Sequence, residues 1–400
     1  MSRLRVLQLD TPFEHEAGGD KNRSRFLWTA LREHCEVDWA RLRPPGTGPW
    51  VAREDARVVP VVDLAAGPGR GLQSQSVFAF DREARKAFND LLANRRYDLV
   101  LARFHAPWEL CHLAARHPAR PAVAVDLDMV SSRLVALTWR QERSFRRRWF
   151  LFEKVKLERL ERRLLEQPWL VWFSNPAEME DCRRRLPPHR LRARVAELPN
   201  VMPPGAPLRD VARAPVILFF GSMNSSANLD GFRFLMDSLL PRLEPDLQRH
   251  GVRIHVVGKN PPAWFAERVR DAATDRIEIV GAVDSMERAI AESRFVLLPL
   301  RVASGTRTRI LEAAAQERGV VTTSIGAEGI EVGDGARVHD TPEELAAAVR
   351  DLLADPGLAD RLGSQLLTRC AGRYSPGTVG DRMAADLTEF VTSQHQGGAA

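Results

Sequence analysis

The stretch FVLLPLRVASGTRTRILEAAA, residues 295–315, decides the fold of this chain. An apolar strand runs from Phe295 to Leu300, a Ser-Gly-Thr turn follows, and a helix begins near Thr308. Such a turn aims backbone N–H groups and the positive end of a helix at one point, which suits a phosphate. Glu312 lies farther along the helix, where a carboxylate suits hydroxyl groups better than phosphates. Phosphate and sugar together indicate a nucleotide; the alternative is an ordinary strand–turn–helix with a Ser or Thr cap.

The length of 400 residues predicts two domains, because a single core rarely grows beyond about 250–300 residues. Hydrophobic residues make up 44% and charged residues 28% of the chain, which is typical of soluble globular proteins. The four cysteines are far apart and form no CxxC pair, which favours reduced thiols over disulfides or a zinc site. We expect neither a signal peptide nor a membrane span, and therefore a cytoplasmic protein.

Strands and helices alternate along the chain, which predicts an α/β fold with two doubly wound parallel sheets. A cluster of prolines around Gly205 marks the best linker. The expected organisation is an N-terminal domain over 1–203, a linker over 204–214, a C-terminal domain over 215–375, a closing helix over 376–392 and a disordered tail over 393–400. The stretch 44–71, rich in proline and glycine, is expected to loop over the surface.

Ligands of doubly wound sheets bind beyond the carboxyl ends of the strands, so the segments that end the strands form the candidate site. In the second half, Gly221–Asn224 could contact a pyrophosphate, although a turn before a helix often has the same residues. Lys259 could stabilise the negative charge of a leaving diphosphate, unless it is an exposed turn lysine. Ala282 and Val283 offer a backbone donor and acceptor to the flat edge of a base, unless they form a structural turn.

Three features of the first half are also candidates. Gly18 and Gly19 precede a helix and would let the backbone approach a phosphate, or they form a plain flexible loop. His105 and the pair Asp126 and Asp128 end later strands and could act as acid–base groups or hydroxyl ligands. A single His at a strand end is more often structural, and nothing else completes a metal site around the aspartates. The chain contains no GxGxxG, P-loop, HExxH or Ser–His–Asp signature.

Residues 140–163 carry ten Arg or Lys against four Glu, an excess equal to the whole formal net charge of +6. The apolar residues among them predict one long helix. A solvated helix face is the simplest interpretation, and a surface for an anionic membrane or an anionic substrate is the alternative. Nucleic acid is not expected as a partner, because the aromatic residues form one block instead of a stacking series.

The second half resembles glycosyltransferase family 4, the retaining GT-B enzymes that use nucleotide-sugar donors. The resemblance runs from about Val216 to Pro356 and rests on FFGSMNSSANLDGFRFL, HVVGKNPP, IEIVGAVDSM, FVLLPLRVASGTRTRILEAAA and VVTTSIGAEGI, in the family's order and spacing. The first half matches loosely, through its Gly-Gly loop, VDLDMVSSR, the helix with two glutamates and LPNVMP. The resemblance implies two Rossmann-like domains facing a central cleft, a donor held mainly by the second domain, no metal or other cofactor, and retention of the anomeric configuration.

Roles for some residues follow from the resemblance by position, and the other candidates come from the strand ends described above. Glu312 matches the glutamate that binds the donor ribose, and Gly19 matches a first-domain glycine near the diphosphate. The expected donor-binding residues are Gly19, Gly221, Ser222, Asn224, Lys259, Ala282, Val283, Ser304, Gly305, Thr306, Arg307 and Glu312. The expected catalytic residues are Lys259, Arg307, Asp128 and His105.

The chain departs from the family pattern around the donor site. Ser304 stands where the family usually has a glutamate eight residues before Glu312, although a subset has the SGTR form. The Arg and Lys often found after the first strand of this half are missing from Gly221–Gly231. In that case Lys259, or an arginine such as Arg301 or Arg307, would have to supply the positive charge.

Two further departures concern other segments. Asp126 or Asp128 stands roughly where many members carry a histidine of the catalytic region. Glu317 and Gly319 replace the usual Gly and Pro after the Glu312 helix, which bears on the turn more than on the chemistry.

Three functional hypotheses remain open at this point. The first is a retaining, metal-independent glycosyltransferase acting on an unidentified acceptor, which could be a glycan, a lipid-linked compound or a natural product. In that case residues 140–163 could contact the inner face of a membrane peripherally. The second is a degenerate, non-catalytic GT-B subunit that binds a nucleotide or glycan. The third is a related GT-B enzyme such as a nucleotide-sugar epimerase.

Overall fold

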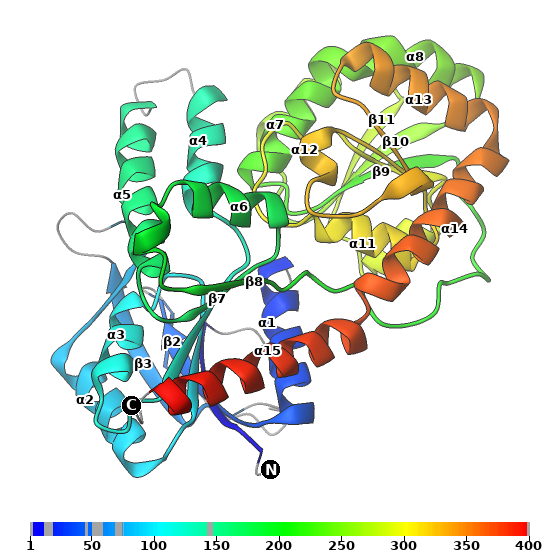
Figure 1. The fold of residues 1–400 in the computed structure, drawn as a ribbon. Coiled ribbons are helices and arrows are strands. Elements are labelled where there is room, and N and C mark those ends of the chain that lie inside the picture. The colour runs from blue at the N-terminus through cyan, green and yellow to red at the C-terminus, as the bar shows by residue number, and fades with distance from the viewer. Residues whose placement is uncertain are drawn as a thin grey trace. The chain divides into compact units, whose positions relative to one another are not determined.

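The computed structural model of the chain describes residues 3–11, 19–44, 47–49, 59–68, 74, 76–141 and 147–397. The chain divides into two compact units, each built on its own sheet with helices around it (Figure 1). Unit 1 comprises Met1–Asn200 and Gly377–Ala400, and unit 2 comprises Val201–Pro376. None of the helices within the described ranges is long and apolar enough to cross a membrane.

Unit 1 has an eight-stranded sheet with the order β4-β3-β2-β1-β5-β6-β7-β8, in which only β3 and β4 pair antiparallel. The strands are β1 (Arg5–Asp10), β2 (Glu36–Arg43), β3 (Val62–Pro68), β4 (Phe78–Phe80), β5 (Leu99–Arg103), β6 (Ala122–Leu127), β7 (Leu170–Phe173) and β8 (Arg194–Glu197). The order reverses between β1 and β5, so the carboxyl ends of these two strands flank the switch point of the sheet.

The helices of unit 1 include the last helix of the chain. They are α1 (Gly19–His34), α2 (Arg82–Asn94), α3 (Trp108–Arg116), α4 (Ser131–Gln141), α5 (Arg147–Leu165), α6 (Pro176–Arg184), the 3-10 turn η1 (Pro188–Arg190) and α15 (Pro376–Gly397). Met383 and Leu387 of α15 are buried, and its Asp386 accepts a hydrogen bond from Nε1 of Trp172 at 2.9 Å. The end of the chain therefore completes the core of unit 1 (Figure 1).

Unit 2 has a six-stranded, all-parallel sheet with the order β11-β10-β9-β12-β13-β14. The strands are β9 (Val216–Phe220), β10 (Arg253–Val257), β11 (Ile277–Gly281), β12 (Phe295–Leu298), β13 (Val320–Thr322) and β14 (Ala336–Val338). Numbered along the chain, this is the doubly wound order 3-2-1-4-5-6, whose switch point lies between β9 and β12.

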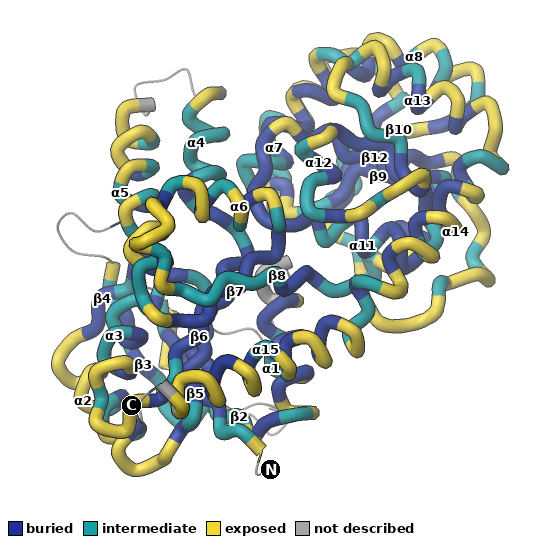
Figure 2. The backbone as a smooth tube through the Cα atoms, in the orientation of Figure 1, coloured by how far each residue is buried: buried dark blue, intermediate teal, exposed yellow. Residues whose placement is uncertain are grey.

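The helices of unit 2 cover its sheet. They are α7 (Ser226–Phe234), the π-helical turn η2 (Leu235–Leu239), α8 (Leu240–Arg249), α9 (Ala263–Asp271), α10 (Met286–Glu292), α11 (Thr308–Ala315), α12 (Ser324–Ala327), the 3-10 turn η3 (Gly333–Gly335), α13 (Pro342–Ala354) and α14 (Pro356–Arg373). Every residue of β9 and β12 is buried, and Figure 2 shows the centre of this unit in dark blue. Helices on both faces explain why these strands are continuous apolar runs without polar alternation.

Three expectations from the sequence need correction. Residues 140–163 do not form one helix: α4 ends at Gln141, α5 begins at Arg147, and the two pack side by side (Figure 1), with 142–146 outside the described residues. The stretch 44–71 contains β3, and most of the rest of it is not described. Helix α15 continues to Gly397, well into the predicted tail. The chain passes from unit 1 to unit 2 after Asn200 and back to unit 1 after Pro376, and the linker over 204–214 remains a prediction.

Helix α11 ends in a turn that explains one departure from the family pattern. The N–H of Glu317 donates to Ala314 O and that of Arg318 donates to Ala313 O, both at 3.0 Å, which is the Schellman arrangement. This places Glu317 in the left-handed region at φ 52°, where glycine is favoured and other residues are strained.

We expect Glu317→Gly to make unit 2 about 1 kcal/mol more stable than Glu317→Ala, because only glycine relieves the left-handed backbone. Both variants lose the exposed ion pair of Glu317 with Arg209, so the comparison cancels that contribution. The measurement is the free energy of unfolding in urea. Equal stabilities of the two variants would show that the turn is not strained.

Candidate functional site

The strands β9, β10 and β11 end in glycines whose backbones touch. The N–H of Gly221 donates to Val257 O at 3.0 Å, and that of Gly258 donates to Gly281 O at 2.7 Å. A Cβ added to Gly258 would lie 1.7 Å from Gly221 O, so no side chain fits there. These turns pack backbone against backbone at the carboxyl end of the sheet, and phosphate binding at this edge remains a prediction.

Asn228 of α7 and Arg309 of α11 close the turn after β9. Asn228 donates through Nδ2 to Ser222 O at 2.7 Å. One terminal nitrogen of Arg309 donates to Phe220 O at 2.8 Å and to Asn228 Oδ1 at 2.5 Å. A Cβ on Gly221 would lie 2.6 Å from Asn228 Nδ2 and 3.0 Å from that Arg309 nitrogen. Arg309 therefore joins α11 to the end of β9 across the switch point.

The sequence interpretation did not select Asn228 or Arg309. One sequence feature could have pointed to Arg309: it is a cation in the first turn of a helix, where the helix dipole disfavours positive charge. Burial lowers the pKa of Arg309 to about 10, and nearby Arg307 contributes in the same direction.

The loop before α11 is held by its own arginine. Gly305 has φ 73°, which requires glycine, and Ser304 and Thr306 are buried on either side. Arg307 is also buried, and its guanidinium donates to Ser304 O and to Ile325 O. In this structure Arg307 stabilises the loop through backbone carbonyls.

The other cations considered for the donor site differ in their surroundings. Arg301 donates to both oxygens of Asp230, at 3.1 and 2.8 Å, so its charge is already compensated. Lys259 is exposed in the turn after β10 and forms no ion pair with any described residue. The backbone O of Lys259 accepts the N–H of Met223 at 3.2 Å, which links this turn to the turn after β9.

Glu312 lies one turn after Arg309 on α11 and is half-buried. Burial raises the pKa of Glu312, and Arg309 opposes part of that shift. Helix residues three positions apart lie on the same face, so the cation and the carboxylate are neighbours at the switch point.

The other residues predicted to bind the nucleotide-sugar donor lie in three different segments. Ser222 and Asn224 share the turn after β9, where their side chains hydrogen-bond to each other at 2.8 Å. Ala282 is exposed after β11, and Val283 is partly buried against the core of unit 2. Gly19 is the first residue of α1 in unit 1, and Gly18 lies outside the described residues.

Unit 1 carries a buried ionic cluster at its own switch point. Arg23 of α1 donates to both oxygens of Asp126, at 2.8 and 2.6 Å, and Arg103 at the end of β5 also donates to Asp126. Burial alone would raise the pKa of Asp126, but Arg23 and Arg103 together lower it. Arg23 also donates to Leu198 O at 2.8 Å, so the cluster ties α1 to the segment that ends the unit.

Asp128 belongs to the same cluster. It accepts a hydrogen bond from Asn200 Nδ2 at 2.9 Å, and one of its oxygens lies 3.6 Å from Arg103. Its side chain is therefore engaged within unit 1. These contacts hold the Asp128 side chain in place, and a catalytic role for Asp128 remains a prediction.

His105 follows β5 and is buried, after Phe104 in a left-handed conformation at φ 56°. Neither ring nitrogen finds a hydrogen-bond partner among the described residues. Burial lowers the pKa of His105 to about 4, so the ring is neutral at pH 7.

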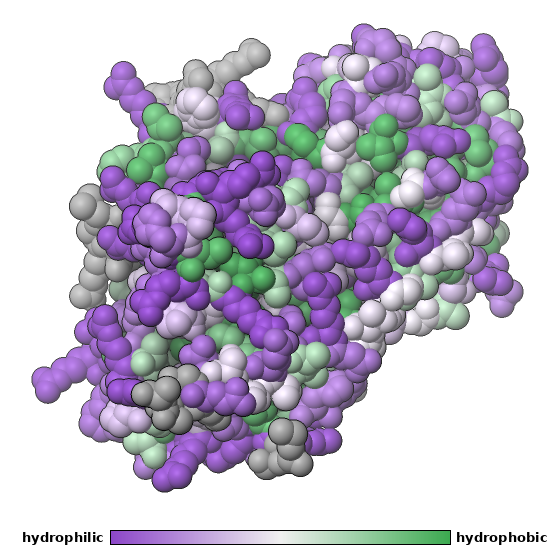
Figure 3. Space-filling model, in the orientation of Figure 1, coloured by the Kyte–Doolittle hydropathy of each residue, from purple (hydrophilic) through white to green (hydrophobic). Residues whose placement is uncertain are grey.

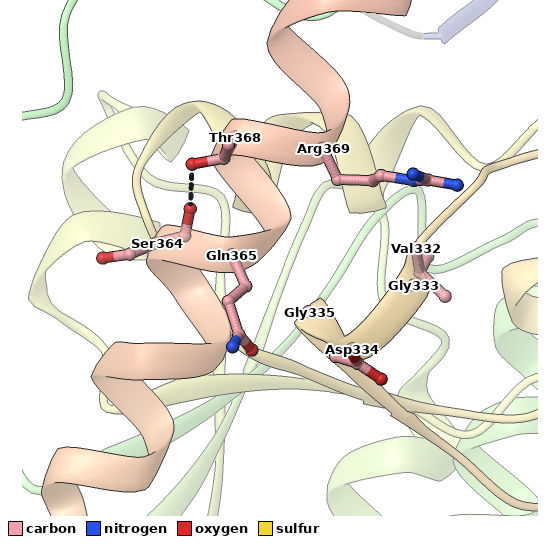
Figure 4. Close-up of a pocket in the computed structure, with 8 residues that line it drawn as sticks. All are labelled: Val332, Gly333, Asp334, Gly335, Ser364, Gln365, Thr368 and Arg369. Atoms are coloured by element: carbon pink, nitrogen blue, oxygen red, sulfur yellow. Dashed lines mark hydrogen bonds between the residues drawn. The ribbon is translucent and has the colours of Figure 1, made fainter.

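A surface depression of unit 2 lies elsewhere. It is lined by residues of η3 and α14, with Arg369 and Asp334 on opposite sides and a Thr368–Ser364 hydrogen bond on the helix side (Figure 4). No residue predicted for the site contributes to it. In the part of the chain that the structure describes, no group of three His, Cys, Asp or Glu side chains could hold a metal ion.

Comparison with known proteins connects this geometry to a family. Residues 214–355 match the family described as glycosyl transferases group 1. Sucrose-phosphate synthase from Thermosynechococcus elongatus has a similar structure, with TM-score 0.72 and 18% identity, covering 98% of this chain and 100% of that one. The fold is GT-B. No curated protein matched the chain.

Two further GT-B structures are similar over nearly the whole chain. HepE from Anabaena, in complex with UDP and glucose, has TM-score 0.60 and 13% identity, covering 96% of this chain and 99% of that one. WaaG, a glycosyltransferase involved in lipopolysaccharide biosynthesis, has TM-score 0.63 and 15% identity, covering 96% of this chain and 100% of that one. The prediction of two Rossmann-like domains in a GT-B fold is thereby confirmed.

We expect His105 to make the stability of the N-terminal GT-B unit depend on pH. Its folded pKa of about 4 lies below the unfolded value of about 6.5, so the unfolded chain binds the proton more tightly. The contribution of His105 to the free energy of unfolding is therefore fully present above pH 6.5 and is lost as the pH falls toward 4. Between pH 7 and 4.5 the native protein should lose about 2 kcal/mol more than His105→Phe. Parallel losses in both proteins, measured by urea unfolding at each pH, would contradict this.

Proposed function

We propose that the protein is a retaining, metal-independent glycosyltransferase that moves a sugar from a nucleoside diphosphate to an acceptor. The single observation that carries the proposal is the switch point of unit 2. There the glycine turns after β9 and β10 meet a helix that presents a cation and then a carboxylate, within the segment that matches the group 1 family. A diphosphate needs close backbone approach and positive charge, and a ribose needs a hydrogen-bond acceptor.

In this proposal Glu312 binds the donor ribose, and Ala282 and Val283 contact the base. The diphosphate and sugar lie against the turn Gly221–Asn224, Lys259 and the loop Ser304–Arg307. Gly19 of unit 1 is proposed as a further donor-binding residue, and His105 and Asp128 of unit 1 as catalytic residues. HepE was determined with UDP and glucose, which makes UDP one of the nucleotides to test first.

We expect Glu312→Ala to weaken nucleoside diphosphate binding about tenfold to a hundredfold, the value of charge-assisted hydrogen bonds to ribose. Binding is measured by calorimetry with UDP, GDP, ADP and dTDP in the presence of EDTA. Glu317→Ala is the matched control, because it removes a carboxylate from the end of the same helix. Unchanged affinity of Glu312→Ala would refute the ribose assignment.

A non-catalytic GT-B subunit is the competing function. It is motivated by Ser304 in the place of the family glutamate and by the missing Arg and Lys in Gly221–Gly231. Donor hydrolysis or transfer by the purified protein would exclude it. Nucleotide binding without turnover across a panel of sugar donors and acceptors would favour it, and sugar isomers formed without acceptor would indicate an epimerase.

We also propose that unit 1 contacts an anionic membrane through the amino-terminal half of α5. Large exposed apolar side chains gather there, with Phe152 57%, Leu151 46% and Trp149 45% exposed. Figure 3 shows hydrophobic surface over this region among polar side chains. Basic residues such as Arg148 and Lys154 accompany them, which is the pattern of an interfacial helix on anionic lipid. WaaG, which acts in lipopolysaccharide biosynthesis, makes a membrane-borne acceptor a reasonable class.

Replacing Trp149 and Phe152 together by serine should lower binding to vesicles containing phosphatidylglycerol by at least about tenfold, because apolar insertion is lost. Leu208→Ser is the matched control, since Leu208 is 41% exposed in unit 2. Binding should also fall with salt and require the anionic lipid. Equal binding to neutral phosphatidylcholine vesicles would rule out the electrostatic part of the proposal.

A further inference from the structure

Arg309 is a half-buried arginine that forms no ion pair with a carboxylate of the described residues. Within the described residues no ion pair includes it, and both of its hydrogen bonds go to neutral oxygens through the same nitrogen. Its other nitrogens, Nε and the second terminal nitrogen, donate to no protein group there. A half-buried charge of this kind is costly, and the positive end of α11 adds to the cost.

The other arginines of this region are satisfied by the protein. Arg301 is paired with Asp230, and Arg307 is held by two backbone carbonyls. Arg318, at the opposite end of α11, donates to Ala291 O at 3.0 and 2.8 Å. Arg309 differs from these arginines because it donates through a single nitrogen, which leaves its Nε and its second terminal nitrogen unused, and because the neighbouring Glu312 offsets its charge only in part.

The position of Arg309 shows where an anion would bind. Its guanidinium is fixed at the end of β9, beside the Gly221 turn, and bridges to β12 through α11. A Cβ at Gly221 would meet Asn228 Nδ2 and Arg309, and one at Gly258 would meet the backbone of Gly221, so both glycines are needed for the turn to hold Arg309 where it lies. Glu312 lies one turn along the same face of the helix, so one nucleotide could reach the cation with its phosphates and the carboxylate with its ribose.

We propose that Arg309 binds the diphosphate of the donor and supplies the charge that the family draws from an Arg and a Lys after the first strand of this domain. This assignment rests on the proposed function. The guanidinium is planar and can bind two phosphate oxygens at once, which suits a diphosphate better than a single ammonium group would. Arg309 would also stabilise the charge on the diphosphate as it leaves the sugar.

The test uses inorganic pyrophosphate as a probe alongside UDP, GDP, ADP and dTDP, titrated into the full chain by calorimetry. Arg309→Gln should lower the affinity for pyrophosphate and for the preferred nucleoside diphosphate about tenfold to a hundredfold. It should lower the affinity for the corresponding nucleoside, which has no phosphate, much less. Arg309→Lys should recover part of the loss. Arg318→Gln is the matched control: it removes an arginine that is bonded to backbone carbonyls beyond the opposite end of α11, and it should not change the affinities.

Asn228→Asp is a second variant in case Arg309→Gln does not fold. Its carboxylate would lie beside the guanidinium and neutralise its charge, so pyrophosphate affinity should again fall. Because the variant also loses the hydrogen bond from Asn228 Nδ2 to Ser222 O, Asn228→Ala is measured beside it to isolate the effect of the charge. Each variant is first compared with the native protein by circular dichroism and thermal unfolding.

The outcomes separate this inference from the proposed function. Pyrophosphate binding that depends on Arg309, without nucleotide binding, would support the anion site and contradict the glycosyltransferase. Nucleotide binding that is equal in the native protein, Arg309→Gln and Asn228→Asp would support the donor site and overturn the role of Arg309. No binding of either probe would overturn both.

Discussion

The contact between the backbones of Gly221 and Gly258 sets the geometry of the whole candidate site. With no Cβ on either residue, the ends of β9 and β10 come close enough for their turns to be joined by hydrogen bonds. Asn228 can then reach Ser222 O, and Arg309 can reach Phe220 O and Asn228. A side chain at either glycine would force the turns apart and displace the arginine, because a packed sheet end cannot yield by several tenths of an ångström without cost.

The two units differ in the partners that they give to an arginine at the switch point of the sheet. In unit 1, Arg23 and Arg103 share the carboxylate of Asp126, and Asp128 lies beside them. Removing one member of such a cluster leaves a buried charge unpaired, so the cluster fixes α1 and three strand ends as one assembly. In unit 2 the protein gives Arg309 only neutral acceptors. The first arrangement is complete within the protein, whereas the second leaves charge available for a ligand.

Much of the unit 2 sheet was predictable, because β9, β10 and β12 are apolar runs separated by helices and strand-ending glycines. The strands β3 and β14 and the helix α14 were not predicted. The three residues of β14 carry too little periodicity, and β3 lies in a stretch dominated by proline and glycine. The interactions at both switch points could not be predicted from the sequence either. Arg23 and Asp126 are 103 positions apart, and Arg309 and Phe220 are 89 apart, so only the folded chain brings them together.

The return of α15 to unit 1 has a consequence for the order in which the chain is made. All residues of unit 2 leave the ribosome before the helix that completes unit 1. Val379, Met383 and Leu387 cover apolar surface of unit 1, so that surface stays open while unit 2 is synthesised. Unit 2 is continuous in sequence, whereas unit 1 is complete only when α15 has joined residues 1–200. A chain truncated near residue 376 would therefore keep all of unit 2 and expose the apolar surface of unit 1 that α15 covers, which favours aggregation.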